Sequence, residues 1–152
     1  PGGYPELHAA RLGANHALRD SLRAHATAGK PVWAECGGMM ALFETLVDKQ
    51  GERPTMWGLL PGRVVMQKRL AALGPQQLVM DGLQLRGHTF HYSLSETPVP
   101  VAARTTRPEG NSSDYEGEAV YLQGPVAASY FHAWFPSAPG LVARLFGPGL
   151  ST

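Results

Sequence analysis

The chain has 152 residues, of which 43% are hydrophobic and 16% charged, a balance that allows a buried core and argues against disorder. Its formal net charge is +1 and its basic residues form no cluster, so we expect no nucleic-acid partner. No apolar stretch approaches the roughly 20 residues of a membrane-spanning helix, so we expect no membrane contact and a cytoplasmic location.

The first part of the chain predicts a helix, a short strand and a second helix. Leucines recur near the helical period in residues 6–28, and this helix either bends at Gly13 or begins at Asn15, a favourable N-cap residue. Residues 32–34 form a short apolar run of strand type. Apolar residues then recur at helical spacing over residues 39–47, which predicts the second helix.

The rest of the chain is expected to be rich in strands, with one helix at the end. Short β-type runs separated by Gly and Pro occupy residues 63–66, 83–86, 119–122 and 126–130. A last helix is predicted after Phe135, where apolar residues return at helical spacing. This order indicates an α/β fold in which helices pack on a sheet, with residues 1–152 in a single domain.

Cys36 follows the predicted strand and directly precedes the second helix. A nucleophile at such a strand-to-helix turn is strained and needs small neighbours, which Ala34 and Gly38 supply. The helix that starts at Gly37 would favour the thiolate and would offer one N–H to an oxyanion. The glycine pair before Tyr4 is a candidate for the second N–H donor, and the lone cysteine cannot form an internal disulfide.

A cysteine nucleophile needs a base, and the chain has six histidines. The three histidines of the first predicted helix are expected to lie on its exposed surface. His132 ends the apolar run 126–131 and should therefore lie at a sheet edge, which makes it the best-placed base. The alternative is structural: Cys36 would be a small buried hydrophobic residue and His132 a hydrogen-bonded histidine without a catalytic role.

Four motifs occur in an order that resembles one protein family. They are Gly-Gly-Tyr-Pro-Glu at 2–6, Ala-Glu-Cys-Gly-Gly-Met-Met at 34–40, Arg-Gly-His-Thr-Phe-His-Tyr-Ser at 86–93 and Ala-Ser-Tyr-Phe-His at 128–132. The chain resembles the C-terminal, class I (triad-type) glutamine amidotransferase domain of cobyrinic or hydrogenobyrinic acid a,c-diamide synthases. The resemblance implies a flavodoxin-like layered sheet with helices on both faces. It also implies that the first strands of this fold and an N-terminal synthetase domain are missing from the sequence.

The same resemblance implies an activity and its residues. Cys36 would be the nucleophile, His132 its base, and Gly3 and Gly37 the oxyanion hole. The domain would hydrolyse L-glutamine to glutamate and ammonia, for ATP-dependent amidation of the side-chain carboxylates of a corrin in cobalamin biosynthesis. ATP, Mg²⁺ and the corrin are expected to bind the synthetase domain, and this chain is expected to hold no cofactor. Whether the corrin contains cobalt, and whether the chain forms a homodimer, stay open.

One residue departs from the family pattern. Many class I members carry a carboxylate two residues after the catalytic histidine, and here that position is Trp134. Glu35 is not expected to replace it, because adjacent strand residues point to opposite faces and only one of Glu35 and Cys36 can enter the site. We therefore expect a Cys-His dyad, or an acid contributed from elsewhere.

The motif at 86–93 contains two further histidines. His88 and His91 would face opposite ways on a strand, so we expect no zinc site there. By the same alternation, His88 and Tyr92 share a face with Phe90, and the motif is expected to line a domain interface or an ammonia path. Two rival functions remain open: a catalytically silent amidotransferase-like binding domain, and a cysteine hydrolase or redox sensor on a related scaffold.

Overall fold

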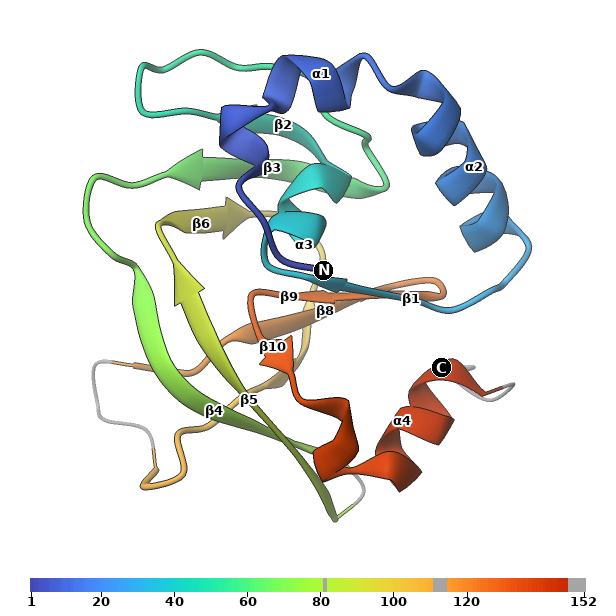
Figure 1. Ribbon diagram of the computed structural model, residues 1–152, viewed down its shortest axis with the longest axis vertical. Coiled ribbons are helices and arrows are strands. Elements are labelled where there is room, and N and C mark those ends of the chain that lie inside the picture. Colours follow the sequence, from blue (N-terminus) through green and yellow to red (C-terminus); the bar gives the residue numbers. More distant parts are fainter. Residues whose placement is uncertain (81, 111–114, 148–152) are drawn as a thin grey trace.

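The computed structural model describes residues 1–80, 82–110 and 115–147 (Figure 1). The helices are η1 Pro5–Leu7, α1 Ala9–Gly13, α2 His16–Thr27, α3 Gly37–Leu42, η2 Phe135–Ser137 and α4 Pro139–Phe146. The strands are β1 Val32–Glu35, β2 Phe43–Val47, β3 Leu60–Met66, β4 Ala72–Met80, β5 Leu83–His91, β6 Ser93–Glu96, β7 Val101–Arg104, β8 Ala119–Gln123, β9 Val126–Ser129 and β10 His132–Ala133. The fold is mixed α/β, as the sequence predicted.

The described strands form three small sheets, with the orders β1-β9-β8-β7, β10-β5-β4 and β2-β3-β6. The described residues thus form several small sheets and not one layered sheet. The chain passes from one sheet to the next within very few residues: only Tyr92 separates β5 from β6, and only two residues separate β9 from β10.

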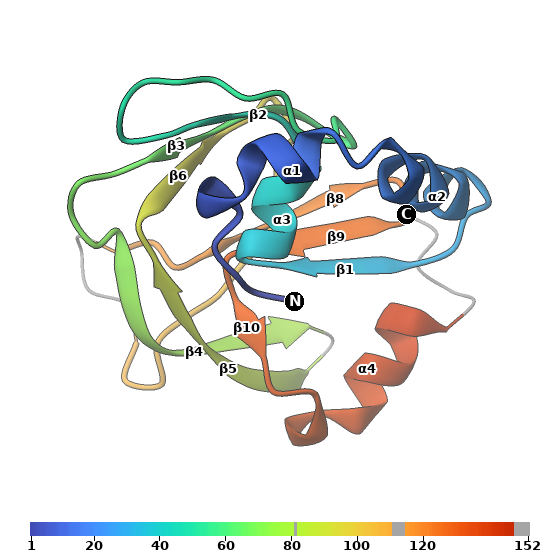
Figure 2. The ribbon, with the colours of Figure 1, turned by 45° about the horizontal axis from the view of Figure 1, so that its top comes forward.

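The four-stranded sheet does carry helices on both faces (Figures 1 and 2). On one face, Ala34 and Ala128 belong to the same buried cluster as the residues of α3. On the other face, Val120 clusters with Leu141 and Leu145 of α4. The alternation of side chains along the strands produces this division, because neighbouring residues point to opposite faces.

The predicted first helix is divided into three pieces, η1, α1 and α2. Asn15 is the N-cap of α2, and its side-chain oxygen accepts a hydrogen bond from the Leu18 N–H at 3.1 Å. The prediction that a helix begins at Asn15 is thus confirmed. Gly13 ends α1 at a place where a Cβ atom would collide with the backbone oxygen of Thr55, so no larger residue fits there.

The predicted second helix is too long. It ends at Leu42, and the following residues form β2, which pairs in parallel with β3. Phe43 and Leu46 are fully buried in this strand. Periodicity alone cannot distinguish a short buried strand from a buried helical turn, which explains the error.

Two clusters of buried side chains hold the fold together. The first surrounds α3, in which every residue except Gly38 is buried. The second lies between β5, the β9–β10 connection and α4, and it contains Leu85, Phe131 and Leu141. Each of these large side chains contributes roughly 1.5–3 kcal/mol by leaving water. Within the described ranges, no helix is long and apolar enough to cross a membrane.

Candidate active site

Cys36 lies at the turn between β1 and α3 in a left-handed backbone conformation, with φ 45° and ψ −112°. Among the residues that the structure describes, it is the one non-glycine residue with positive φ. Its N–H donates to Ser129 O at 2.8 Å, and its carbonyl accepts from Met40 N–H at 2.9 Å. Such a conformation costs about 1–3 kcal/mol and persists because the neighbouring structure enforces it. The predicted strained turn is confirmed.

The glycines around Cys36 allow the first residues of the chain to lie directly on the turn. A Cβ atom at Gly37 would collide with the carbonyl oxygen of Gly3 and would lie 2.9 Å from its nitrogen. A Cβ atom at Gly38 would lie 2.7 Å from the carbonyl oxygen of Pro1. The two glycines predicted to form the oxyanion hole are therefore adjacent in space, beside Cys36.

The thiol of Cys36 is buried, and its environment favours the protonated form. Burial raises its pKa to about 11, although the Gly37 N–H lowers it, and nearby carboxylates including Glu6 raise it further. Its Sγ donates a long hydrogen bond to Phe90 O at 3.8 Å. The start of α3 lowers the pKa as expected, through the Gly37 N–H, but burial outweighs this effect, so the net shift favours the thiol.

His132 lies in β10, opposite His88 of β5. The two imidazole rings are stacked, with centroids 4.7 Å apart. A Cβ atom at Gly2 would lie 2.5 Å from Cε1 of His132, so the start of the chain packs on this ring as well. Burial and then His88 lower the pKa of His132 below its ordinary value of 6.5, so the ring is neutral at pH 7 and can accept a proton.

Cys36 and His132 both lie beside the first residues of the chain, but their side chains are not hydrogen-bonded to each other. Gly2 contacts the His132 ring, while Gly3 contacts Gly37 beside the cysteine. In the described part of the chain, the Cys36 thiol is hydrogen-bonded to Phe90 and not to His132. Direct proton transfer between the two side chains therefore requires a rearrangement of this site.

The cavity at Cys36 is small. Its volume is about 30 Å³, and its walls include Gly3, Glu6 and Met40 as well as Phe90 and Tyr92. Such a volume has room for roughly one or two water molecules and not for an amino acid. A substrate the size of glutamine can reach Cys36 only after some of these residues move.

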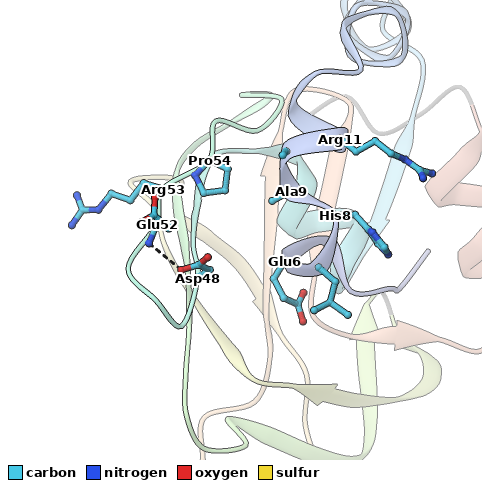
Figure 3. A pocket seen from close by; sticks show the side chains of 10 residues that line it. Glu6, His8, Ala9, Arg11, Asp48, Glu52, Arg53 and Pro54 are labelled. Atoms are coloured by element: carbon cyan, nitrogen blue, oxygen red, sulfur yellow. Dashed lines mark hydrogen bonds between the residues drawn. The ribbon is translucent and has the colours of Figure 1, made fainter.

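A larger cavity lies next to this one and does not contain Cys36. It measures about 630 Å³ and lies between η1–α1 and the turn after β2 (Figure 3). Glu6 lines both cavities, and Figure 3 shows it across the larger cavity from Asp48. The larger cavity holds charged side chains but no nucleophile, so we assign the chemistry to the smaller one, where the cysteine is.

The side chains of the 86–93 motif alternate as predicted. His88, Phe90 and Tyr92 are exposed, whereas Thr89 and His91 are buried. His91 stacks on Tyr130 with ring centroids 3.7 Å apart, and its Nδ1 lies 2.8 Å from Ser93 O. His91 therefore belongs to the buried wall of the Cys36 cavity, whereas Phe90 and Tyr92 line the cavity and are also partly exposed.

Sequence reasoning missed Glu118, a buried carboxylate behind His91. Its Oε1 accepts hydrogen bonds from Thr89 Oγ1 and Tyr115 O–H, both at 2.8 Å, and lies 3.2 Å from His91 Nε2. Burial raises the pKa of Glu118, but the bond and charge of His91 together with the two hydroxyl groups lower it below the ordinary range. No local pattern marks this residue, because its partners come from distant segments.

Glu35 points away from the Cys36 cavity, as the alternation of strand side chains predicted. Its Oε1 accepts two hydrogen bonds, from Trp33 Nε1 at 2.8 Å and from the Ala133 N–H at 2.9 Å. Ala133 directly follows His132. Trp134, which replaces the expected acid, is exposed and lies against the Arg86 guanidinium at 5.0 Å.

No group of three or more His, Cys, Asp or Glu side chains arranged to hold a metal ion occurs in residues 1–80, 82–110 and 115–147. The described residues of the site offer a thiol at a strained turn, backbone N–H groups beside it, and a neutral imidazole nearby. This combination suits attack on a carbonyl carbon followed by acyl transfer.

Comparison with known proteins gives consistent matches over nearly the whole chain. Cobyrinate a,c-diamide synthase of Herminiimonas arsenicoxydans is 49% identical over 148 residues, which are 97% of this chain and 33% of that protein. Hydrogenobyrinate a,c-diamide synthase of Pseudomonas aeruginosa is 48% identical over 148 residues, with the same two shares. The cobyrinate a,c-diamide synthase of Salmonella typhimurium is 39% identical over 151 residues, 93% of this chain and 32% of that protein.

The chain thus spans about a third of the length of these curated relatives. Residues 1–139 match the family model described as the CobB/CobQ-like glutamine amidotransferase domain. The matched region contains the Cys36 turn, the buried wall behind it and His132. The chain belongs to the family of CobB/CobQ-like glutamine amidotransferase domains.

Proposed function

We propose that this chain is the glutaminase part of a cobyrinate or hydrogenobyrinate a,c-diamide synthase. It hydrolyses L-glutamine to glutamate and ammonia, and the ammonia amidates side-chain carboxylates of the corrin in cobalamin biosynthesis. The observation that carries the proposal is the strained backbone of Cys36 at the end of β1, in a chain of this family. A backbone held at positive φ in a non-glycine residue is a feature of functional sites.

In this mechanism Cys36 forms a covalent intermediate. Its thiol gives its proton to His132, and the sulfur attacks the side-chain carboxamide carbon of glutamine. The N–H groups of Gly3 and Gly37 stabilise the oxyanion. The C–N bond then breaks, ammonia leaves with the proton from His132, and a glutamyl thioester remains. Water, deprotonated by His132, attacks the thioester and releases glutamate and the thiol.

The resting site must open before this chemistry can begin. The thiol has a pKa of about 11, and the cavity beside it measures about 30 Å³. We infer that glutamine binding moves side chains that line the cavity, Tyr4 among them, while Gly3 stays beside Gly37. This movement admits the substrate and lets the His132 imidazole approach Sγ. In the open site, the Cys36 thiol would donate to the His132 imidazole and no longer to Phe90 O.

The rest of the reaction would take place in a longer protein. Residues 1–152 would be its glutaminase domain, and a synthetase part would bind ATP, Mg²⁺ and the corrin. Since β1 is an edge strand of its sheet, further strands could pair with it and complete a flavodoxin-like layered sheet. The location would be cytoplasmic, and assembly as a homodimer is open to measurement by light scattering.

The exposed face of β5 is proposed as the surface toward the synthetase part. His88 and Phe90, which is 38% exposed, lie on this face, and the exposed Tyr92 directly follows β5 and contacts Phe90 edge-on. The Lys49 ammonium lies 5.4 Å from the centre of the Tyr92 ring. Because Phe90 and Tyr92 also line the Cys36 cavity, ammonia that leaves this cavity past them would emerge at the same face. His91 would support this route from behind.

The test uses 6-diazo-5-oxo-norleucine, a glutamine mimic that alkylates catalytic thiols. The chain, and a longer protein that contains it, are incubated with the reagent with and without glutamine, and the adduct is located by mass spectrometry. We expect a single adduct on Cys36 that glutamine suppresses, and none in a Cys36→Ala variant. An unlabelled Cys36 in the longer protein would remove the nucleophile assignment.

The buried thiol also favours a second candidate, a catalytically silent binding domain. In that case Cys36 would fill the core near α3 and react with neither reagent nor glutamine. The same labelling experiment separates the two functions. A redox sensor is disfavoured, because oxidation selects exposed cysteines of low pKa, and that of Cys36 is raised to about 11 by burial.

A further inference from the structure

The carboxylate of Glu35 joins the strand of the nucleophile to the strand of the histidine. Glu35 is the last residue of β1 and directly precedes Cys36. Its Oε1 accepts from the Ala133 N–H at 2.9 Å, and Ala133 follows His132 in β10. The bond spans 98 positions of the sequence, so it fixes the relative position of two segments that the chain itself does not connect.

Strand β10 is short, and its backbone is held to β5 by a few bonds, including Trp134 N–H to Arg86 O at 2.8 Å directly after the strand. It has two residues, and among the described strands it pairs with β5 alone, through His132 with His88 and Ala133 with Gly87. On its other side, the Ala133 N–H bond to Glu35 connects it to the β1 sheet. A strand this short has too few ladder bonds to fix its own position, so one charge-assisted bond matters.

The indole of Trp33 holds Glu35 in the orientation that this bond requires. Its Nε1 donates to the same Oε1 atom at 2.8 Å. Trp33 itself packs edge-on against Phe135, with ring centroids 6.4 Å apart. Glu35 is therefore fixed from two sides, by a side chain of its own strand and by the backbone of β10.

The charge of Glu35 also acts on the imidazole. Burial lowers the pKa of His132 most, followed by the stacked His88, while Glu35 raises it. The amino group of Pro1 and His91 lower it by smaller amounts. Glu35 is thus the carboxylate whose charge favours the imidazolium form of His132, which is the form created when the histidine takes the proton of a nucleophile.

We propose that Glu35 is the positioning residue for His132. It takes the role of the acid that Trp134 does not supply, but it acts through the backbone of the neighbouring residue and by its charge across the sheet boundary, and not by a bond to the imidazole. This inference rests on the proposed glutaminase function for its catalytic consequence, and on the contacts of Glu35 alone for its structural part.

Three substitutions of Glu35 distinguish the effect of its hydrogen bond to Ala133 from the effect of its negative charge. Glu35→Gln keeps an oxygen that can accept from Ala133 but removes the charge, Glu35→Asp keeps the charge but is too short to reach, and Glu35→Ala removes both. Trp33→Phe removes the donor that orients the carboxylate. Glu116→Gln is the matched control, because it removes one negative charge from a side chain that is 77% exposed and pairs with Arg104.

The first readout is the titration of His132 in the 152-residue chain. Imidazole carbon–proton NMR signals are followed with pH, and His132 is assigned by its loss in His132→Gln. Glu35→Gln should move the His132 titration to lower pH, and Glu116→Gln should not. Glu35→Asp should keep the titration near that of the wild type while the Ala133 N–H exchanges faster with solvent.

The second readout is glutaminase turnover. Glu35→Ala should lower kcat on the order of 100-fold with KM changed by less than about threefold, because the histidine is misplaced while glutamine binding is not altered. Glu35→Gln should lower kcat by a smaller factor. The acid limb of its kcat/KM profile should move to lower pH, together with the His132 titration. The kcat of Trp33→Phe should lie between those of the wild type and Glu35→Ala.

An unchanged His132 titration in both Glu35→Gln and Glu35→Ala would overturn the proposal, as would wild-type kcat in Glu35→Ala. If Glu35→Ala does not fold, Glu35→Gln decides, since it keeps the hydrogen bond. If the wild-type chain itself releases no glutamate but its His132 titration responds to Glu35, the proposed function fails in this chain while the positioning role stands.

Discussion

Cys36 combines a strained backbone with a protected side chain. The positive φ of 45° presents the residue at the end of β1, yet the residue is only 6% exposed. The Sγ atom is engaged with Phe90 O, and the cavity beside it is too small for an amino acid. The same turn that makes the thiol available to a substrate therefore keeps it unreactive until the site opens.

We predict that alkylation of Cys36 by iodoacetamide is slow at neutral pH and rises with pH. With a pKa of about 11, about one thiol in a thousand is ionised at pH 8, because each pH unit below the pKa reduces the thiolate tenfold. The rate is measured by mass spectrometry between pH 7 and pH 10, where Cys36, the single cysteine of the chain, is the one thiol to follow. A rate that is already constant at pH 7 would contradict the prediction and indicate a stabilised thiolate.

At the level of elements, Glu118 connects strand β5 to the segments that follow β7 and precede β8, behind the active site. It accepts hydrogen bonds from Thr89 of β5 and from Tyr115, and it lies 3.2 Å from Nε2 of His91. Its own N–H donates to Thr105 Oγ1 at 2.8 Å. Because these donors are buried, removing the carboxylate would leave several polar groups without a partner.

Glu118→Ala should lower the free energy of unfolding by about 1–3 kcal/mol at pH 7, the usual range for buried donors left unsatisfied. The pKa of Glu118 is below its ordinary value of 4.5 in the folded chain. Its contribution is therefore complete above pH 4.5 and is lost as the pH falls through the lower, folded-state value. Urea unfolding at several pH values measures both effects.

The matched control for Glu118 is Glu116→Ala, which removes an exposed carboxylate paired with Arg104. It should change stability by less than about 1 kcal/mol. The wild type should also lose more stability than Glu118→Ala between pH 4.5 and acid pH. Equal losses in the two variants, or parallel pH profiles for wild type and Glu118→Ala, would show that the network does not stabilise the fold.

For the molecule as a whole, local features could be predicted from the sequence and long-range ones could not. The order β1, Cys36, α3 and the N-cap Asn15 depend on residues within a few positions of one another, and both predictions are confirmed. The division into three sheets depends on pairings such as β10 with β5, which join distant segments. The bond from Glu35 to Ala133 and the partners of Glu118 are equally invisible in the sequence, because they exist only after the chain has folded.

Phe131 lies where two of the sheets meet. It is fully buried between β9 and β10, and it belongs to the cluster that contains Leu85, Leu141 and Leu145. Gly87 of β5 approaches it so closely that a Cβ atom there would lie 2.6 Å from its ring. The ring thus packs the β5 sheet and α4 together, directly before His132.

We therefore predict that Phe131→Ala lowers the free energy of unfolding of the whole chain by about 3–5 kcal/mol, the range for a large aromatic side chain removed from a core. Phe146→Ala is the control, because Phe146 is also aromatic and lies on α4 but is 42% exposed. It should lower the free energy of unfolding by less than half as much. Denaturant unfolding, followed by tryptophan fluorescence and by circular dichroism, measures both variants. Since Phe131 joins two sheets, the two signals should shift together in Phe131→Ala. A shift in one signal alone would mean that the β5 sheet unfolds independently of the sheet that carries Cys36.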